Sequence, residues 1–150
     1  MKDVRVLQTE ESTDAQARCQ ATPSNRILVV DDDIDLRVLS ADVLAHSGYQ
    51  VDTAEDGAAG WEALHAKSYD LLITDHSMPK LSGVELVKKL RSARMALPVI
   101  LASGALPTEE LDRNPWLQPT ATLLKPFTTA KLLGTVKEVL AQPTVPAAAL

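Results

Sequence analysis

Short apolar runs alternate along the chain with longer stretches in which apolar residues recur every three or four positions. A short apolar run between polar residues is typical of a buried strand, and the longer spacing is typical of a helix with one buried face. The pattern predicts strands at residues 26–30, 49–54, 69–74, 98–102 and 123–124, with a helical stretch after each. Strands separated by crossovers pair in parallel through right-handed connections and need helices on both faces. The sequence therefore predicts an α/β fold with a doubly wound parallel sheet.

Residues that favour helix ends stand at the borders of the helical stretches. The expected N-caps are Asp33, Asp56, Ser82 and Thr128, and the expected stop of the first helix is Gly48. The residues expected on the buried face of the first helix are Leu36, Leu39, Val43 and Leu44. Trp61 and Trp116 are interpreted as packing residues. Prolines at 107, 115 and 119 leave room only for a short fourth helix, at residues 108–113.

Four of the predicted strands end in polar residues. Their ends carry the run Asp31-Asp32-Asp33 and the single residues Asp75, Ser103 and Lys125. In an open α/β sheet, ligands bind at the carboxyl ends of the strands. The sequence therefore predicts one acidic pocket that holds a divalent cation and a phosphoryl group.

The charges of this pocket indicate its chemistry. Two carboxylates about 4 Å apart repel by roughly 4 kcal/mol at an effective dielectric constant near 20. Only Lys125 would offset the charges of Asp31, Asp32 and Asp75, so the site either takes up a proton or binds a cation. Oxygen ligands suit Mg²⁺, and a charge-compensated carboxylate can act as a nucleophile toward phosphorus. Taken singly, Asp33 is interpreted as a helix cap and Asp75 as an ordinary turn residue, but four such groups at one sheet edge are hard to obtain by chance.

Composition narrows the possible classes of function. The chain of 150 residues allows one domain, and its 45% of hydrophobic residues indicate a globular protein. A formal charge of -5 argues against a nucleic-acid surface, and no apolar run is long enough to span a bilayer. No secretory signal is visible and the single Cys19 cannot form an internal disulfide, so a cytoplasmic protein is expected. Residues 1–24 are interpreted as a flexible leader, 25–141 as the domain and 142–150 as a flexible tail.

Four segments resemble the motifs of one family, the response regulator receiver domains of two-component signalling. Residues 27–33, with the sequence Ile-Leu-Val-Val-Asp-Asp-Asp, resemble the opening of such a domain. Residues 70–86, which include Asp75, resemble its phosphoacceptor segment, and residues 98–104 and 124–127 resemble its two remaining motifs. The resemblance covers about residues 26–141. It implies a flavodoxin-like (βα)5 fold with strand order 2-1-3-4-5, here with a shortened, proline-interrupted fourth helix.

The resemblance also implies a role for each polar group. Asp75 would accept a phosphoryl group from a histidine kinase or a histidine phosphotransfer protein. The protein ligands of Mg²⁺ would be Asp31, Asp32, Asp75 and the backbone carbonyl of Ser77. Ser103 and Lys125 would bind the phosphoryl group, and the Lys125–Pro126 peptide bond is expected to be cis.

Departures from the family pattern concern the output more than the chemistry. Thr122 stands where the family usually carries an aromatic switch residue, and Ser77 stands where other members carry larger polar groups. We expect a non-enzymatic signalling domain with a phosphorylation-dependent binding surface, or a relay station, either alone or as part of a larger hybrid kinase. The expected partners are the phosphodonor protein and a downstream protein target, with no nucleic acid and no membrane. A monomer or weak dimer is expected.

Three other functions share part of this sequence pattern. A small phosphatase of the haloacid-dehalogenase type would use Asp31 as its nucleophile with Asp33 two residues on, although its usual Gly-Thr, cap insertion and late acidic pair are absent. A flavin-binding module would need a hydroxyl-rich phosphate loop, whereas three aspartates there would repel phosphate. A receiver-like domain that is never phosphorylated is disfavoured by the complete set of acidic residues.

Overall fold

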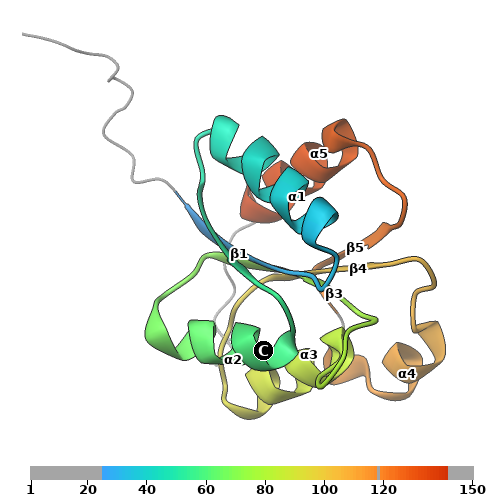
Figure 1. Cartoon of the computed structure of the whole chain (residues 1–150). Helices are drawn as coiled ribbons and strands as arrows, with labels where there is room; N and C mark the ends of the chain where they lie inside the picture. The colour runs from blue at the N-terminus through green and yellow to red at the C-terminus, as the bar shows by residue number, and fades with distance from the viewer. Residues whose placement is uncertain (1–24, 118, 142–150) are drawn as a thin grey trace, which may run out of the picture.

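Five parallel strands form one sheet at the centre of the molecule (Figure 1). The computed structural model describes residues 25–117 and 119–141, so the interpretation of residues 1–24 and 142–150 as leader and tail lies outside the described residues. The strands are β1 (Arg26–Val30), β2 (Gln50–Ala54), β3 (Leu71–Asp75), β4 (Val99–Ser103) and β5 (Ala121–Leu124). Their order is β2-β1-β3-β4-β5, which confirms the predicted topology.

Helices cover both faces of the sheet, as the alternating pattern predicted. The helices are α1 (Ile34–His46), α2 (Gly57–Ala66), α3 (Gly83–Ser92), α4 (Thr108–Arg113) and α5 (Thr129–Ala141), with a short 3-10 helix, η2 (Pro115–Leu117). Figure 1 shows α1 and α5 on one side of the sheet and α2, α3 and α4 on the other. None of the described helices is long and apolar enough to cross a bilayer.

The core consists of two apolar layers, one on each face of the sheet. Successive side chains of a strand point to opposite faces, so Leu28 and Val30 pack under α2 and α3, while Ile27 and Val29 pack under α1 and α5. All five residues of β3 and of β4 are buried. These two strands and β1 are therefore buried between the two helix layers, and their carboxyl ends lie side by side in a fixed arrangement.

The helix ends follow the predicted capping residues. The Asp33 carboxylate accepts hydrogen bonds from the backbone N–H groups of Asp35 and Leu36, and Asp56 accepts one from Ala59. Ser82 and Glu85 form a reciprocal capping box at the start of α3. Thr128 caps α5 through the N–H of Lys131, and Gly48 ends the first helical unit with a φ of 98°. These caps fix where each helix begins, and so they fix the positions of the polar residues between a strand and the helix that follows it.

Two packing predictions were wrong. Leu39, which was expected on the buried face of the first helix, is 51% exposed, and Trp116, which was interpreted as a packing residue, is 54% exposed. In α1 the residues that face the sheet are Ser40 and Leu44, one helical turn apart, so Leu39 is rotated toward solvent. Trp116 lies in η2, where the neighbouring Leu117 takes the buried position instead.

The fourth helix is short, as the prolines predicted. Pro107 precedes its first turn, and after Asn114 the chain continues as η2 rather than as a regular helix. Leu111 and Leu117 anchor this segment to the core layer of α2 and α3, and an ion pair of 3.4 Å joins Lys88 of α3 to Glu110. Leu124, at the end of the edge strand β5, is 60% exposed.

Candidate functional site

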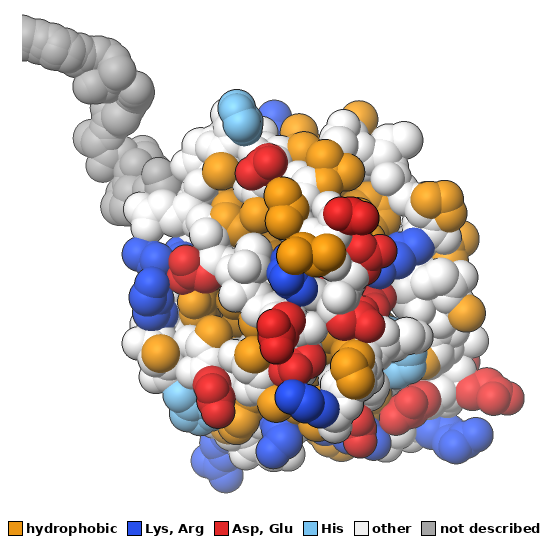
Figure 2. Space-filling view, in the orientation of Figure 1, with side chains coloured by type: hydrophobic (Ala, Val, Ile, Leu, Met, Phe, Trp, Pro, Cys, Tyr) orange, Lys and Arg blue, Asp and Glu red, His pale blue; other side chains and the backbone are white. Residues whose placement is uncertain are grey.

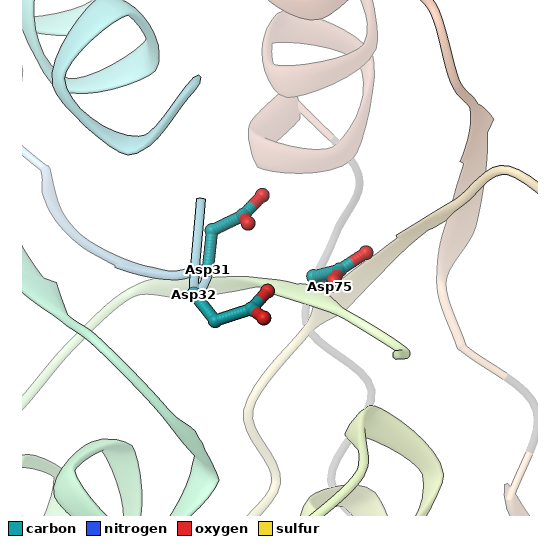
Figure 3. Close-up of side chains that lie close together, drawn as sticks. All are labelled: Asp31, Asp32 and Asp75. Carbon is teal, nitrogen blue, oxygen red and sulfur yellow. The ribbon is translucent and has the colours of Figure 1, made fainter. Parts of the chain in front are cut away.

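Three carboxylates meet where β1 and β3 end side by side. Asp31 and Asp32 follow β1, and Asp75 is the last residue of β3. One carboxylate oxygen from each lies within 4.8 Å of the others. Figure 3 shows the three side chains directed to the same side of the sheet edge. The predicted acidic cluster is therefore present, and it is created by the parallel pairing of two strands whose acidic residues are far apart in the sequence.

Asp31 is anchored through its polar atoms. Its carboxylate accepts a hydrogen bond of 2.9 Å from the N–H of Asp33 and one of 3.1 Å from Lys125 Nζ. Its N–H donates to the carbonyl of Ala54 at 3.1 Å, and its own carbonyl accepts from the Arg37 guanidinium at 2.7 Å. The exposed Asp32 carboxylate, in contrast, accepts no hydrogen bond from any residue that the structure describes. The direction of the Asp31 carboxylate is thus fixed by hydrogen bonds, whereas that of Asp32 is not.

Lys125 supplies the cation of the site from the end of β5. Its Nζ lies 2.9 Å from Asp75 Oδ1 and 3.1 Å from Asp31 Oδ2, and its side chain is mostly buried. Burial alone would lower the pKa of Lys125, but the hydrogen bonds to Asp75 and Asp31 outweigh it, so the pKa is raised. The Lys125–Pro126 peptide bond is cis, as expected. Lys125 is therefore a firmly protonated donor that bridges two of the three carboxylates.

The environment of Asp75 disfavours its charged form. Burial raises the pKa of Asp75, and the charges of Asp31 and Asp32 raise it further, while the hydrogen bond and charge of Lys125 lower it only in part. Two carboxylates about 5 Å apart repel by roughly 3 kcal/mol at an effective dielectric constant near 20. Three such groups beside one lysine, all with oxygen ligands, suit a hard divalent cation such as Mg²⁺.

Ser103 and Ser77 lie at the same edge but have other contacts. Ser103 is the buried last residue of β4, and its hydroxyl donates to the carbonyl of Ala105 at 2.9 Å and accepts from the Ala105 N–H at 3.2 Å. Ser77 is exposed in the turn after Asp75. The structure thus brings Asp31, Asp32, Asp75 and Lys125 together, while the Ser103 side chain is bound to its own loop.

Glycines hold the turn after Asp75 close to its neighbours. A Cβ atom at Gly83 would collide with the backbone carbonyl of Asp75, and one at Gly57 would lie 2.5 Å from the backbone oxygen of Leu81. The N–H of Gly83 donates to the carbonyl of His76 at 2.9 Å. The start of α3 is therefore packed directly against the end of β3, which fixes the backbone around Asp75.

Arg37 contacts the acidic cluster and was not among the site residues predicted from the sequence. It lies in the first turn of α1 and reaches back to the Asp31 carbonyl. A signal was available, because a cation in the first turn of a helix interacts unfavourably with the helix dipole. A hollow of about 470 Å³ lies elsewhere, at the amino ends of the strands, and contains none of the residues of the acidic cluster; its lining includes Tyr69, Leu97, Pro98 and Leu140.

Comparisons with known proteins agree with this geometry. The profile of the response regulator receiver domain matches residues 27–137. The chain is 33% identical over 115 residues to the probable transcriptional regulatory protein SilR of Salmonella typhimurium, covering 77% of this chain and 50% of SilR. It is 37% identical over 116 residues to the response regulator RppA of Synechocystis, covering 75% of this chain and 49% of RppA. The chain thus spans about half the length of these relatives.

Solved structures show the same fold. The chemotaxis response regulator CheY4 of Vibrio cholerae is 30% identical, with a TM-score of 0.71 over 78% of this chain and 99% of CheY4. The response regulator TrrA of Thermotoga maritima, solved in complex with Mg²⁺ and BeF, is 32% identical, with a TM-score of 0.68 over 77% of this chain and 98% of TrrA.

These relatives give the phosphatase and flavin alternatives no support. The structure also disfavours Asp31 as a nucleophile, since both of its carboxylate oxygens already accept hydrogen bonds, from Asp33 and Lys125. Receiver domains bind Mg²⁺ at an acidic pocket and interact with histidine kinases or phosphotransfer proteins. With a matching profile over most of its length and relatives above 30% identity, the chain belongs to the response regulator receiver domain family.

Proposed function

We propose that Asp75 accepts a phosphoryl group from a histidine kinase or a histidine phosphotransfer protein, and that the phosphorylated domain then binds a downstream protein target. The observation that carries the proposal is the position of Asp75 between two other carboxylates and a bridging lysine. Its backbone is held by β4 and by the start of α3, so its carboxylate has a defined direction. A nucleophile of this kind needs charge compensation and positioning more than further covalent chemistry.

The step is an in-line displacement at phosphorus. An oxygen of Asp75 forms the new P–O bond while the P–N bond of the phosphohistidine breaks, and the electron pair stays on the imidazole nitrogen of the donor. Lys125, 2.9 Å from Asp75 Oδ1, would hydrogen-bond a phosphoryl oxygen. The residues that would hold Mg²⁺ are Asp31, Asp32, Asp75 and the backbone carbonyl of Ser77. The ion, when bound, supplies positive charge that offsets the oxygens of the transferring group.

Ser103 would transmit the phosphorylation of Asp75 to the loop that follows β4. Among the described residues its hydroxyl bonds to Ala105, and it can exchange these bonds for one to the phosphoryl group. The loop that follows β4 would then change its backbone contacts. Such a loop with two sets of partners is the kind of bistable element that signalling requires.

The direct test is phosphorylation of the chain by acetyl phosphate with Mg²⁺, followed by intact-mass analysis and peptide mapping. We expect one phosphoryl group on Asp75 and none on the nearly isosteric variant Asp75→Asn. In that reaction the P–O bond to acetate breaks in place of the P–N bond. Mapping of the adduct to Asp31, or rapid catalytic turnover without an adduct, would contradict the proposal and favour the phosphatase alternative.

An apolar stripe on α1 supports a protein phosphodonor. Ile34 is 60% exposed, and Val38 and Leu39 are each 51% exposed. Figure 2 shows hydrophobic side chains gathered over α1, with acidic side chains close by at the end of the sheet. Ile34 directly follows the acidic loop, so a partner that reaches Asp75 would contact this stripe. We include it in the proposal as the docking surface for the phosphodonor.

A charged substitution in the stripe separates docking from chemistry. Val38→Glu should slow transfer from a phosphodonor protein that phosphorylates the wild type by at least about tenfold, equivalent to about 1.4 kcal/mol. Phosphorylation by acetyl phosphate should be unchanged. Trp116→Glu, at a similarly exposed apolar position in η2, is the matched control. If Val38→Glu and Trp116→Glu accept the phosphoryl group from the phosphodonor protein at equal rates, the stripe on α1 is not the docking surface.

The proposal concerns the receiver domain. Several relatives are transcriptional regulatory proteins about twice the length of this match, so the expectation of no nucleic-acid partner stays a prediction and applies to residues 25–141. A cytoplasmic location and a monomer or weak dimer are likewise part of the proposal. We expect the domain to act by binding its target in response to phosphorylation.

A further inference from the structure

The contact between Arg37 and the acidic loop has no purely local explanation. Arg37 is the fourth residue of α1, where its positive charge meets the positive end of the helix dipole. Its half-buried side chain turns back to the carbonyl oxygen of Asp31, with Nη1 at 2.7 Å. A charge-assisted hydrogen bond of that length offsets an unfavourable helix position. The contact therefore points to a role in the loop rather than in the helix.

The atom that Arg37 binds determines what it controls. The carbonyl of Asp31 belongs to the peptide plane that joins Asp31 to Asp32. The Asp31 N–H belongs to the preceding peptide plane, and the Asp32 N–H, the other polar group of this plane, donates to no described residue. Within the described residues, the Arg37 bond is therefore the hydrogen bond that anchors this plane. Rotation of the plane would swing the backbone of Asp32. Because the Asp32 carboxylate has no hydrogen bond to a described residue, its direction depends on that backbone.

We propose that Arg37 is a positioning residue that holds the Asp31–Asp32 peptide plane and so directs the Asp32 carboxylate toward the divalent cation. The inference rests on the proposed magnesium site. A positioning role and a simple effect of charge predict opposite changes in Mg²⁺ affinity when Arg37 is replaced. A nearby positive charge repels Mg²⁺, so its loss would tighten binding if charge alone mattered. If positioning dominates, its loss weakens binding, as the loss of a hydrogen bond behind a metal ligand does.

The experiment compares Mg²⁺ affinity by titration calorimetry in the full chain and its variants. Arg37→Met keeps the length of the side chain but removes the charge and all donors, and it should weaken Mg²⁺ binding about tenfold. Arg37→Lys restores a charged donor and should recover much of the loss. Arg91→Met is the matched control, because Arg91 also donates to backbone carbonyls, of Met95 and Leu97, but in the turn before β4 at the opposite edge of the sheet. It should leave the affinity unchanged.

A second measurement does not depend on the metal. The N–H of Asp33 donates to the Asp31 carboxylate, so a loosened loop should exchange this amide faster in Arg37→Met than in the wild type without Mg²⁺. Mg²⁺ affinity in Arg37→Met equal to or tighter than in the wild type would overturn the positioning role. If the wild type itself binds no Mg²⁺, the proposed metal site falls as well, and the two failures are thereby distinguished.

Discussion

Lys125 offers the sharpest test of how charge is balanced in this domain. Lys125→Met keeps the aliphatic stem and removes the ammonium group that lies 2.9 Å from Asp75 and 3.1 Å from Asp31. At an effective dielectric constant near 20, each of these contacts is worth about 5.5 kcal/mol before the cost of burying the ammonium is subtracted. Removal of one partner from a buried ion pair typically costs about 3–5 kcal/mol. We therefore expect the free energy of unfolding to fall by about 3 kcal/mol without divalent cations.

Mg²⁺ should reverse much of this loss. The lysine and the metal ion compensate the same carboxylates, so removal of the lysine leaves more charge for the ion to neutralise. Saturating Mg²⁺ should consequently stabilise Lys125→Met by more than it stabilises the wild type. In the wild type, an ion at about 100 times its dissociation constant should add roughly 2.7 kcal/mol.

Urea unfolding at neutral pH, with either a chelator or millimolar Mg²⁺, measures the free energy of unfolding of the wild type and of Lys125→Met with and without the metal. Lys131→Met is the control, because Lys131 is exposed on α5. It should change neither the stability nor the response to Mg²⁺ by more than about 0.5 kcal/mol. If Lys125→Met and the wild type are equally stable without metal, or gain equal stability from Mg²⁺, Lys125 and the ion do not neutralise the same carboxylates.

Three further predictions follow from the same site. The raised pKa of Lys125 means that its stabilising effect is complete below 10.5 and is lost as the pH rises through the raised value, so unfolding curves of wild type and Lys125→Met should converge at alkaline pH. The pKa of Asp75 is raised above 3.8, so stability without metal falls as the pH rises through the raised value; Asp75→Asn should lack this fall and be more stable at neutral pH. Beryllofluoride with Mg²⁺, which mimics the phosphoryl group, should change amide exchange at residues 103–116. Changes confined to the loops around the carboxylates would exclude transmission of the signal through Ser103 and the loop after β4. No ring movement is expected there, since Thr122 has none.

Much of the architecture followed from local rules. The N-caps Asp33, Asp56 and Ser82 were predicted because their side chains satisfy free N–H groups of the next residues in the chain. The fourth helix at residues 108–113 was predicted because prolines limit it at both ends. The boundaries of β2 and β3 differ from the prediction by one or two residues, since hydrogen bonding to neighbouring strands decides where a strand starts.

Contacts between distant residues could not be derived in this way. The pattern of an isolated helix does not tell whether Leu39 or Ser40 faces the sheet, because that depends on how α1 lies across the strands. The Ser103 hydroxyl was expected at the phosphoryl site, and only the folded loop shows that Ala105 binds it in this state. The unfavourable position of Arg37 in the first turn of α1 is visible in the sequence, but its partner is not, because a backbone carbonyl leaves no trace in side-chain composition.

By itself, the sequence determined the strands, most helix ends, and which polar residues would stand at one edge of the sheet. The tertiary structure alone decided that Asp31, Asp32 and Asp75 come within 4.8 Å and that Lys125 bridges two of them. The physical reason is the range of the forces involved. Capping and periodicity act between residues a few positions apart, whereas the distances between charges depend on the register of β1, β3 and β5 and on the packing of both helix layers.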